Sequence, residues 1–122
     1  MTHFTVNNLN QTAVYWGAPL NDGYGGYGWE EPREISCRWE SSTRVILDST
    51  GKEIIPQAEV QVAEDLEEHG MLLLGELDDL DSAQADDPVE AGAREIVRFD
   101  KVPTLDGLYF YRKAFVVAYT RG

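Results

Sequence analysis

Seven carboxylates within a short stretch are the side chains of this sequence that come closest to a binding chemistry: Glu76, Asp78, Asp79, Asp81, Asp86, Asp87 and Glu90. An EF-hand loop binds calcium through alternating oxygen donors, with a glycine at the sixth position and a glutamate at the twelfth. Counted from Asp79, Asp81 falls at the third position and Glu90 at the twelfth. Ala83 and Gln84, however, occupy the fifth and sixth positions. The pattern therefore favours a solvated acidic loop over a calcium site.

A second pattern, Gly23-Tyr-Gly-Gly-Tyr-Gly28, satisfies the spacing G-x-G-x-x-G. A dinucleotide-binding fingerprint needs a strand before it and a helix after it. Here a strand follows, and Pro32 with its polar neighbours leaves no amphipathic helix. We interpret the segment as a glycine loop that presents Tyr24, Tyr27 and Trp29 to another protein, because aromatic side chains are enriched at such interfaces.

No group of residues in the sequence predicts catalysis or a cofactor. Cys37 lies on the apolar side of a predicted strand and has no identifiable base partner. His3 and His69 lack neighbours at zinc-ligand spacing. Thr50-Gly51-Lys52 resembles the end of a phosphate-binding loop, but Glu53 stands where Ser or Thr is required. We therefore expect a protein that is not an enzyme and that holds no metal or cofactor.

The charge of the chain is strongly segregated. The formal net charge is −12, and residues 53–93 contain thirteen acids and no lysine or arginine. The remaining residues carry nine acids against ten bases. A sequence pI near 4.4 makes general binding to nucleic-acid phosphates unfavourable. A single-sign field of this kind attracts a cation, imitates a nucleic acid or keeps one away.

The 122 residues predict one domain, and the single cysteine favours a reducing compartment. The N-terminal residues lack the charged and then apolar pattern of a secretion signal. The longest apolar run, residues 114–119, is far shorter than a membrane span. We expect an intracellular protein, or one that leaves the cell without a secretion signal.

Short segments of alternating polar and apolar residues predict strands separated by turns. They are residues 12–16, 34–39, a hairpin at 43–55, 58–62, 71–74, 94–100 and 108–119. This pattern predicts a mainly β fold, a small β-barrel or sandwich with long loops and little helix. We expect a flexible N-terminal arm at 1–11 and a single domain at 12–122, with an exposed acidic loop at 75–92.

Arg112 and Lys113 interrupt the last aromatic strand. Two interpretations remain open: the bases protect an exposed sheet edge from aggregation, or they contact a partner. In the second interpretation, an identical neighbouring subunit would supply the acidic surface that the two bases contact.

Eight short motifs, taken in order, resemble one family. They are Asp22-Gly-Tyr-Gly-Gly-Tyr-Gly-Trp29, Arg38-Trp-Glu40, Asp48 with Gly51 and Glu53, Gly70-Met-Leu-Leu-Leu-Gly75, Ala91-Gly-Ala-Arg-Glu-Ile96, Phe99-Asp-Lys-Val-Pro103, Leu105-Asp-Gly107 and Tyr111-Arg-Lys-Ala-Phe115. The set resembles the small head–tail joining (head-completion, or stopper) proteins of long-tailed bacteriophages. The likeness covers about residues 12–117, and none of its motifs is catalytic.

The resemblance implies a β-barrel-like virion protein that forms a homo-oligomeric ring in the neck, below the portal or adaptor protein. Such a ring closes the DNA channel and docks the tail tube or tail terminator protein. It would be made in the host cytoplasm, let DNA pass without binding it specifically, and contact no membrane. We assign the acidic loop to the channel, and Tyr24, Tyr27, Trp29, Arg112 and Lys113 to the assembly interface.

Two other functions remain open. An acidic inhibitor that imitates DNA needs carboxylates fixed on ordered elements, which an exposed loop does not provide. A cation-binding β module would gain thermal stability from calcium.

Overall fold

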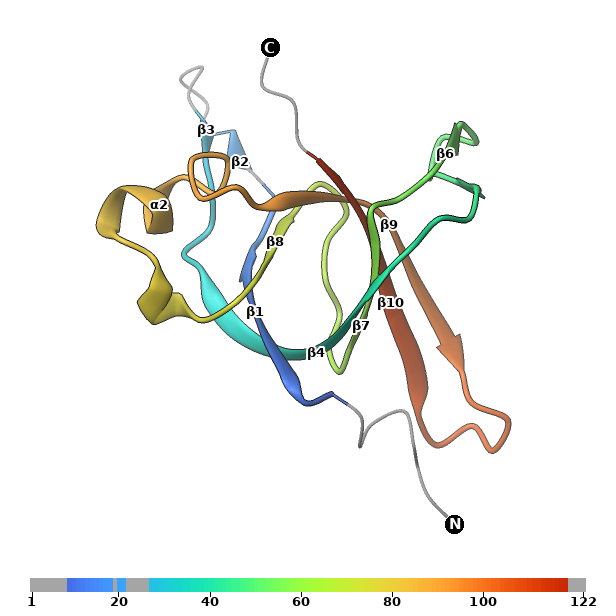
Figure 1. Ribbon diagram of the computed structural model, residues 1–122. Coiled ribbons are helices and arrows are strands. Elements are labelled where there is room, and N and C mark those ends of the chain that lie inside the picture. The colour runs from blue at the N-terminus through green and yellow to red at the C-terminus, as the bar shows by residue number, and fades with distance from the viewer. Residues whose placement is uncertain (1–8, 19, 22–26, 119–122) are drawn as a thin grey trace.

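The computed structural model describes residues 9–18, 20–21 and 27–118 (Figure 1). In chain order, the elements are β1 (Gln11–Trp16), β2 (Leu20–Asn21), β3 (Tyr27–Gly28), β4 (Arg33–Ser41), β5 (Ile46–Leu47), β6 (Glu53–Ile54), β7 (Ala58–Val62), β8 (Met71–Leu74), η1 (Leu77–Asp79), α2 (Ser82–Asp86), β9 (Arg94–Pro103) and β10 (Phe110–Ala118). Six strands close an antiparallel barrel in the order β1-β4-β7-β10-β9-β8. The predicted small β-barrel with little helix is confirmed.

Alternation along the strands places the core inside the barrel. On β4, Ile35 and Cys37 are buried while their neighbours are exposed, and β7 alternates in the same way. Cys37 pairs with Val62 across the two strands, so a single register aligns both apolar rows. The interior cluster combines these side chains with residues of the other four barrel strands. Cys37 is the small core residue that its strand position predicts.

Strand β1 is buried on both faces. Ala13 and Tyr15 point into the barrel, whereas Val14 and Trp16 belong to a second apolar cluster with Met71. A strand covered on both sides reads as a continuous apolar run rather than as an alternating one. The second cluster therefore needs a cover outside the barrel wall.

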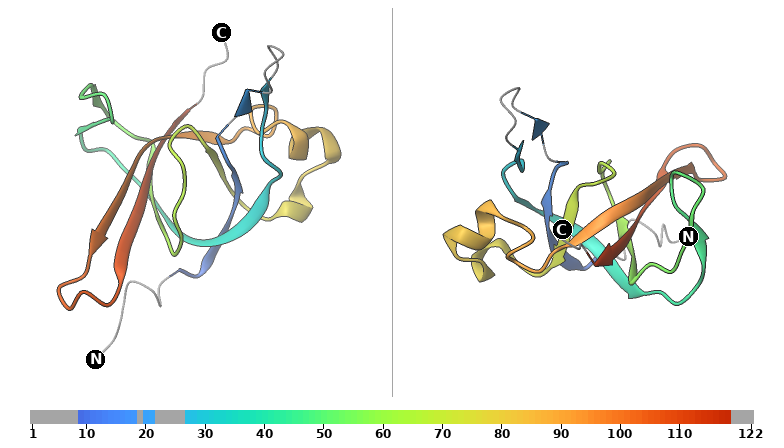
Figure 2. Two further views of the ribbon diagram at one scale, coloured as in Figure 1. Left: turned by 180° about the vertical axis from the view of Figure 1, so that it is seen from behind. Right: turned by 90° about the horizontal axis from the view of Figure 1, so that it is seen from above.

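Residues 75–92, predicted to be an exposed loop, are that cover. Most of their acids are exposed, as predicted, but the segment is not a loop throughout. The segment forms η1 and α2. Its apolar residues pack on the outer face of β1 and β8, and Pro88 is fully buried. Figures 1 and 2 show it as a separate layer beside the barrel. We call residues 75–92 the acidic lobe.

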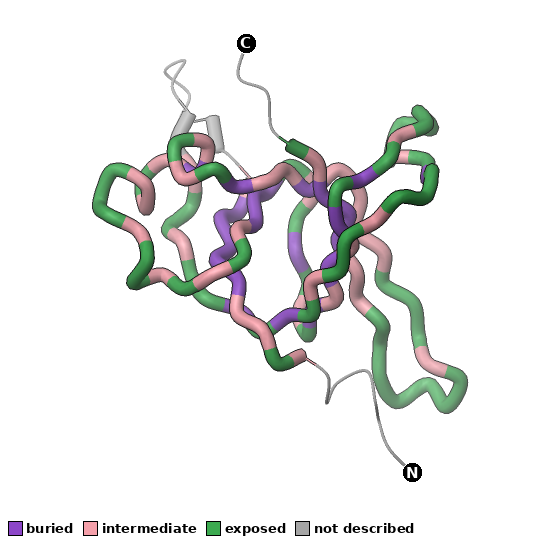
Figure 3. Tube along the Cα trace, in the orientation of Figure 1, coloured by how far each residue is buried: buried purple, intermediate pink, exposed green. Residues whose placement is uncertain are grey.

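Strands β9 and β10 extend beyond the barrel on the other side. They pair from Arg94 with Ala118 to Pro103 with Phe110, whereas the pairing of β10 with β7 ends at Arg112. The free part projects as a long hairpin, seen in red and orange at the lower right of Figure 1, and Figure 3 shows it as mostly exposed. We call residues 101–112 the arm.

The predicted hairpin at 43–55 is present as the β5–β6 pair, in which Ile46 faces Ile54. Asp48 fixes its turn, because the side chain accepts hydrogen bonds from the Thr50 and Lys52 backbone N–H groups. Gly51 adopts a φ of 88°, in the left-handed region that favours glycine. This hairpin projects on the same side of the barrel as the arm (Figure 1).

Candidate functional site

The acidic lobe is held to the barrel by apolar packing and by three long-range hydrogen bonds, one of which runs from the Gly75 N–H to the Thr12 carbonyl oxygen at 2.9 Å. Trp16 Nε1 donates to the Ala85 carbonyl oxygen at 2.8 Å, and the Leu77 N–H donates to Glu34 Oε2 at 2.7 Å. Four apolar side chains of the lobe pack against the Trp16 cluster: Leu77, Leu80, Val89 and Ala91. The lobe is thus part of the folded domain.

Some acids of the lobe also shape its backbone. Asp81 caps α2: its side chain accepts a hydrogen bond from the Gln84 N–H at 2.8 Å, and the Asp81 N–H donates one to Gln84 Oε1 at 3.1 Å. At η1, the Glu76 N–H donates a hydrogen bond to Asp79 Oδ2 at 3.0 Å. The reciprocal pair at α2 is a capping box, which satisfies backbone donors that a helix start leaves open. These acids therefore occupy defined positions.

Six of the seven acids of the lobe form no ion pair within the described part of the chain. None of the ion pairs found there includes Glu76, Asp78, Asp79, Asp81, Asp86 or Glu90. The same part of the chain holds no cluster of histidine, cysteine and acidic side chains suited to a metal ion. The lobe presents a folded, strongly negative surface to solvent.

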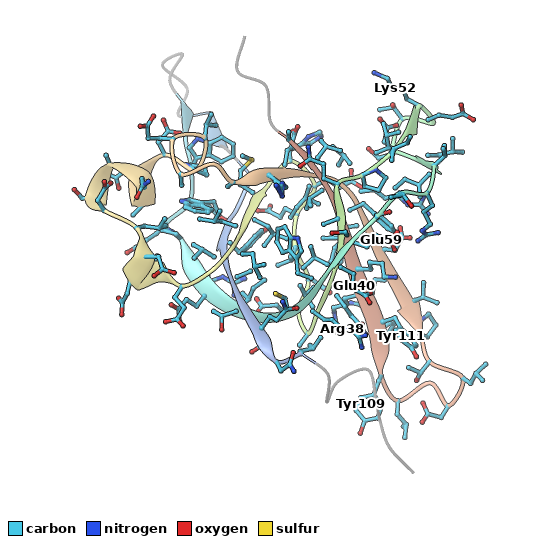
Figure 4. All side chains as sticks on the ribbon, viewed as in Figure 1. Arg38, Glu40, Lys52, Glu59, Tyr109 and Tyr111 are labelled. Carbon is cyan, nitrogen blue, oxygen red and sulfur yellow. The ribbon has the colours of Figure 1, made fainter. Side chains whose placement is uncertain are left out.

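The arm has the opposite character, because its tip is apolar. Leu105 and Leu108 are 110% and 72% exposed. Among the described residues, nine of the ten large apolar side chains that are exposed lie on the arm or on the β5–β6 hairpin. They are Val45, Leu47, Ile55, Val102, Leu105, Leu108, Tyr109, Phe110 and Tyr111. Tyr109 and Tyr111 are labelled on the arm in Figure 4. Clustered exposed apolar groups mark interaction surfaces.

Ion pairs fix the root of the arm. Glu59, at the β7–β10 interface, accepts two hydrogen bonds from Arg44, one from Ser42 Oγ and one from Lys113 Nζ. The Arg44 guanidinium contributes most to lowering the Glu59 pKa, followed by Ser42 and Lys113, and the pKa is about 2. The Glu59 side chain is only 12% exposed, so water screens these bonds weakly. Glu59 is therefore the strongest charged anchor of this side (Figure 4).

A second carboxylate, Asp65, bridges the two strands of the arm. It accepts hydrogen bonds from Arg112 Nε at 2.7 Å and from Lys101 Nζ at 3.2 Å, and both bases lower its pKa. The same two bases lie over the Phe110 ring, at 4.7 Å for Lys101 and 5.5 Å for Arg112. The arm is consequently braced where it leaves the barrel.

A hollow of about 620 Å³ extends from the two ends of the acidic lobe to Trp39, Ser41 and Gln57, where the β5–β6 hairpin leaves the barrel. Its lining includes Leu74, which directly precedes the lobe, and Gly92, the last lobe residue. Ser41, Gln57 and Arg94 make much of its lining polar, and Leu72 in its wall is fully buried. Leu74 is 45% exposed.

The predicted interface residues fall in different places. Tyr24 lies outside the described residues, and the structure describes only the backbone of Tyr27, in β3. Trp29 is half-buried and packs against the Trp16 cluster, so it supports the attachment of the lobe. The role of Tyr24, Tyr27 and Trp29 at an interface stays a prediction.

Arg112 and Lys113 do not protect a sheet edge, and that interpretation is wrong. Arg112 pairs with Val62 on one side and Lys101 on the other, so it lies inside the sheet. Lys113 has the same double pairing. Both bases form intramolecular ion pairs at the root of the arm. Their predicted role at an interface stays a prediction.

The single cysteine is not activated for catalysis. Burial raises the pKa of the Cys37 thiol to about 11, so it is not a ready nucleophile.

No helix in the described part of the chain is long and apolar enough to cross a membrane. The arm and the acidic lobe are the surfaces whose properties the fold itself does not require.

Comparisons of the chain with models of known protein families, with curated proteins and with solved structures found no match.

Proposed function

We propose that this chain is a structural protein of the head–tail connector of a tailed bacteriophage, and not an enzyme. It forms a homo-oligomeric ring below the portal or adaptor protein, closes the DNA channel and docks the tail tube or tail terminator protein. It acts in the neck of the virion and assembles in the host cytoplasm. The sequence resemblance suggests this role.

One structural observation supports the proposal best: a small closed barrel carries two unlike surfaces on opposite sides, the apolar-tipped arm and the acidic lobe (Figures 1 and 2). A ring whose subunits meet head to tail needs two different patches on each subunit. A protein with one patch, or with two equivalent patches, would favour a closed dimer instead.

The acidic lobe suits the channel side of such a ring. Like charges repel, so a channel lined with carboxylates lets DNA pass without adhering to its phosphates. We place Glu76, Asp78, Asp79, Asp81, Asp86, Asp87 and Glu90 along that path. The assembly interface would include Tyr24, Tyr27, Trp29, Arg112 and Lys113, and Trp29 would then act partly by holding the lobe in place.

The test is assembly of particles without this chain. The proposal predicts DNA-filled heads and separate tails, and rejoining when the purified protein is added. Normally joined, infectious particles in its absence would refute the function.

One observation favours a second candidate function, an acidic inhibitor that imitates DNA. Six of the seven carboxylates of the lobe, all but Glu90, lie on η1, α2 and their caps, and the lobe packs on the core. Fixed carboxylates are what such an inhibitor needs, so the objection based on a loose loop no longer applies. Inhibition of a DNA-cleaving enzyme by the purified chain, relieved by competitor DNA, would favour this candidate.

A further inference from the structure

The wall of the barrel opens beside the acidic lobe. Strand β8 pairs with β9 only through Met71 and Leu72, so Leu73 and Leu74 have no partner on β9. The chain leaves the wall there, forms the lobe and returns to β9 at Arg94. The hollow of about 620 Å³ lies at this opening, where β4 and β8 end and β7 and β9 begin. It is the mouth of the barrel, where ligand sites of β-barrels are commonly found.

Arg94, in the lining of the hollow, is a base without a partner. The structure describes every lysine and arginine except Arg121, which makes nine. Seven of these nine form an ion pair, and Arg94 and Lys52 do not. Lys52 is exposed, whereas Arg94 is half-buried and fixed in the sheet between Leu72 of β8 and Ala118 of β10. A chain of net charge −12 thus holds a half-buried base that none of its described carboxylates meets.

Three other polar groups of the lining are also uncommitted. Ser41 Oγ, the side-chain amide of Gln57 and Trp39 Nε1 form no hydrogen bond with any residue that the structure describes. Their backbones are nevertheless held in place. The Trp39 N–H donates to Gln11 Oε1 at 2.7 Å, and the Gln57 N–H donates to the Val116 carbonyl oxygen at 2.8 Å. A few polar groups on a fixed frame around one hollow are typical of a ligand site.

The lining also has an apolar part and, among its described residues, no acidic side chain. Trp39 packs against the interior cluster, and Leu74 is 45% exposed. Gly92 has a φ of 82°, which favours glycine, and open space lies where a Cβ would be. This part of the wall is therefore left without a side chain, and the hollow can receive a group that is partly apolar.

We propose that the hollow binds a carboxylate joined to an aromatic or aliphatic body, as in a small organic acid or the last residue of a peptide. The Arg94 guanidinium pairs with the carboxylate, because its planar fork matches two carboxylate oxygens. Ser41 and Gln57 offer further hydrogen bonds, and the body lies against Trp39 and Leu74. One base balances one negative charge, and the net charge of −12 disfavours a ligand of higher charge.

Calorimetric titration tests the site with two probes that differ only in the carboxylate, N-acetyl-L-phenylalanine and its amide. We expect the unaltered chain to bind the acid with a dissociation constant of about 1 mM or tighter. The amide should bind at least about tenfold more weakly, because it lacks the charged partner of Arg94. Changes in the backbone amide spectrum should centre on the lining of the hollow and leave the arm unaffected.

Arg94→Gln should bind the acid at least about tenfold more weakly and the amide equally well, so that the preference for the acid is lost. Arg94→Lys keeps the charge and should keep part of the preference. It replaces the first variant if glutamine impairs folding, which circular dichroism shows. Lys52→Gln is the matched control, because it removes the other base without an ion pair, outside the hollow. It should bind both probes like the unaltered chain.

Two more probes separate the sources of the carboxylate. Tighter binding of acetyl-glycyl-glycyl-phenylalanine than of 3-phenylpropionate would assign the ligand to the end of a peptide. The reverse order would assign it to a small organic acid. Both results support a carboxylate site.

The inference is overturned if the acid does not bind at millimolar concentration, or if acid and amide bind equally. Equal losses in Arg94→Gln and Lys52→Gln would also overturn it, because net charge would then explain the binding. Spectral changes centred on the arm would place the ligand elsewhere and have the same consequence. The role in head–tail joining is tested separately by particle assembly, and neither result decides the other.

Discussion

The acidic lobe and the arm use charge and apolar packing in opposite ways. The lobe is attached by apolar side chains packed around Trp16 and turns its carboxylates to solvent. The arm is attached by ion pairs of Glu59 and Asp65 and turns its apolar side chains to solvent. In each region, the side chains that face solvent differ from the side chains that attach the region to the barrel. Both surfaces are therefore available to a partner, and the following experiments test that difference.

Removing the anchor of the lobe should have the largest effect. Trp16→Ala deletes a fully buried side chain and its hydrogen bond to Ala85, and we expect a loss of about 3–5 kcal/mol in unfolding free energy. Amide exchange should accelerate throughout residues 75–92. Trp16→Phe keeps most of the packing and should cost only about 1–2 kcal/mol. Unchanged exchange protection of α2 in Trp16→Ala would mean that the lobe is ordered independently.

Removing the charged anchor of the arm should have an intermediate effect. Glu59→Gln leaves Arg44 and Lys113 without their carboxylate, and we expect a loss of about 1–3 kcal/mol, measured by urea unfolding. Glu40→Gln is the matched control, since Glu40 pairs opposite Glu59 but is mostly exposed and contacts only Arg38 at 3.4 Å. It should change stability by less than about 0.5 kcal/mol. Equal effects would show that Glu59 is an ordinary surface acid.

Acid should loosen the root of the arm through the same residue. The pKa of Glu59 is lowered from 4.5 to about 2 in the folded protein. Its stabilising contribution is complete above pH 4.5 and is lost as the pH falls towards 2. Asp65 and Asp48 shift in the same direction. Unfolding free energy should therefore fall across this window, and less steeply in Glu59→Gln. Parallel pH profiles for the two proteins would contradict the assignment.

Removing a helix cap should have a smaller and local effect. Asp81→Ala deletes the acceptor of the Gln84 N–H hydrogen bond, and we expect a loss of about 1 kcal/mol together with faster exchange within α2. Asp86→Ala removes the same charge from the end of the helix, where no capping bond is lost. It should leave α2 intact. If both variants behave alike, charge rather than capping determines the order of the lobe.

The exposed tip should have the smallest effect on stability. Leu105→Ser with Leu108→Ser should change the unfolding free energy by no more than about 0.5 kcal/mol, because neither side chain is buried. Leu72→Ala, in the core, should cost about 2–5 kcal/mol. A large loss in the tip variant, measured by thermal unfolding, would mean that the tip packs within its own subunit.

The barrel could be predicted because polar and apolar residues alternate along its strands. Along β4 and β7 every second residue is apolar and faces the interior, and this period is visible without neighbours. The sequence could not reveal where the barrel ends. The arm continues the aromatic pattern of β10, and only the register shows that pairing with β7 stops at Arg112.

The lobe was misread because its apolar residues lack a period. Leu77, Leu80, Val89 and Ala91 are irregularly spaced among acids, as expected of a segment that covers a surface through two short helices and turns. The indication that a segment covers the barrel from outside was in β1 instead. Val14 and Trp16 are apolar on the face that should meet solvent, so some other segment had to cover them.

The most direct test of the proposed function is electron cryomicroscopy of the neck of particles from the genome that encodes this chain. The account predicts a ring of small barrels between portal and tail, with acidic lobes towards the DNA path. A neck that lacks this chain, together with a purified chain that blocks a DNA-cleaving enzyme, would contradict the connector and favour the acidic inhibitor.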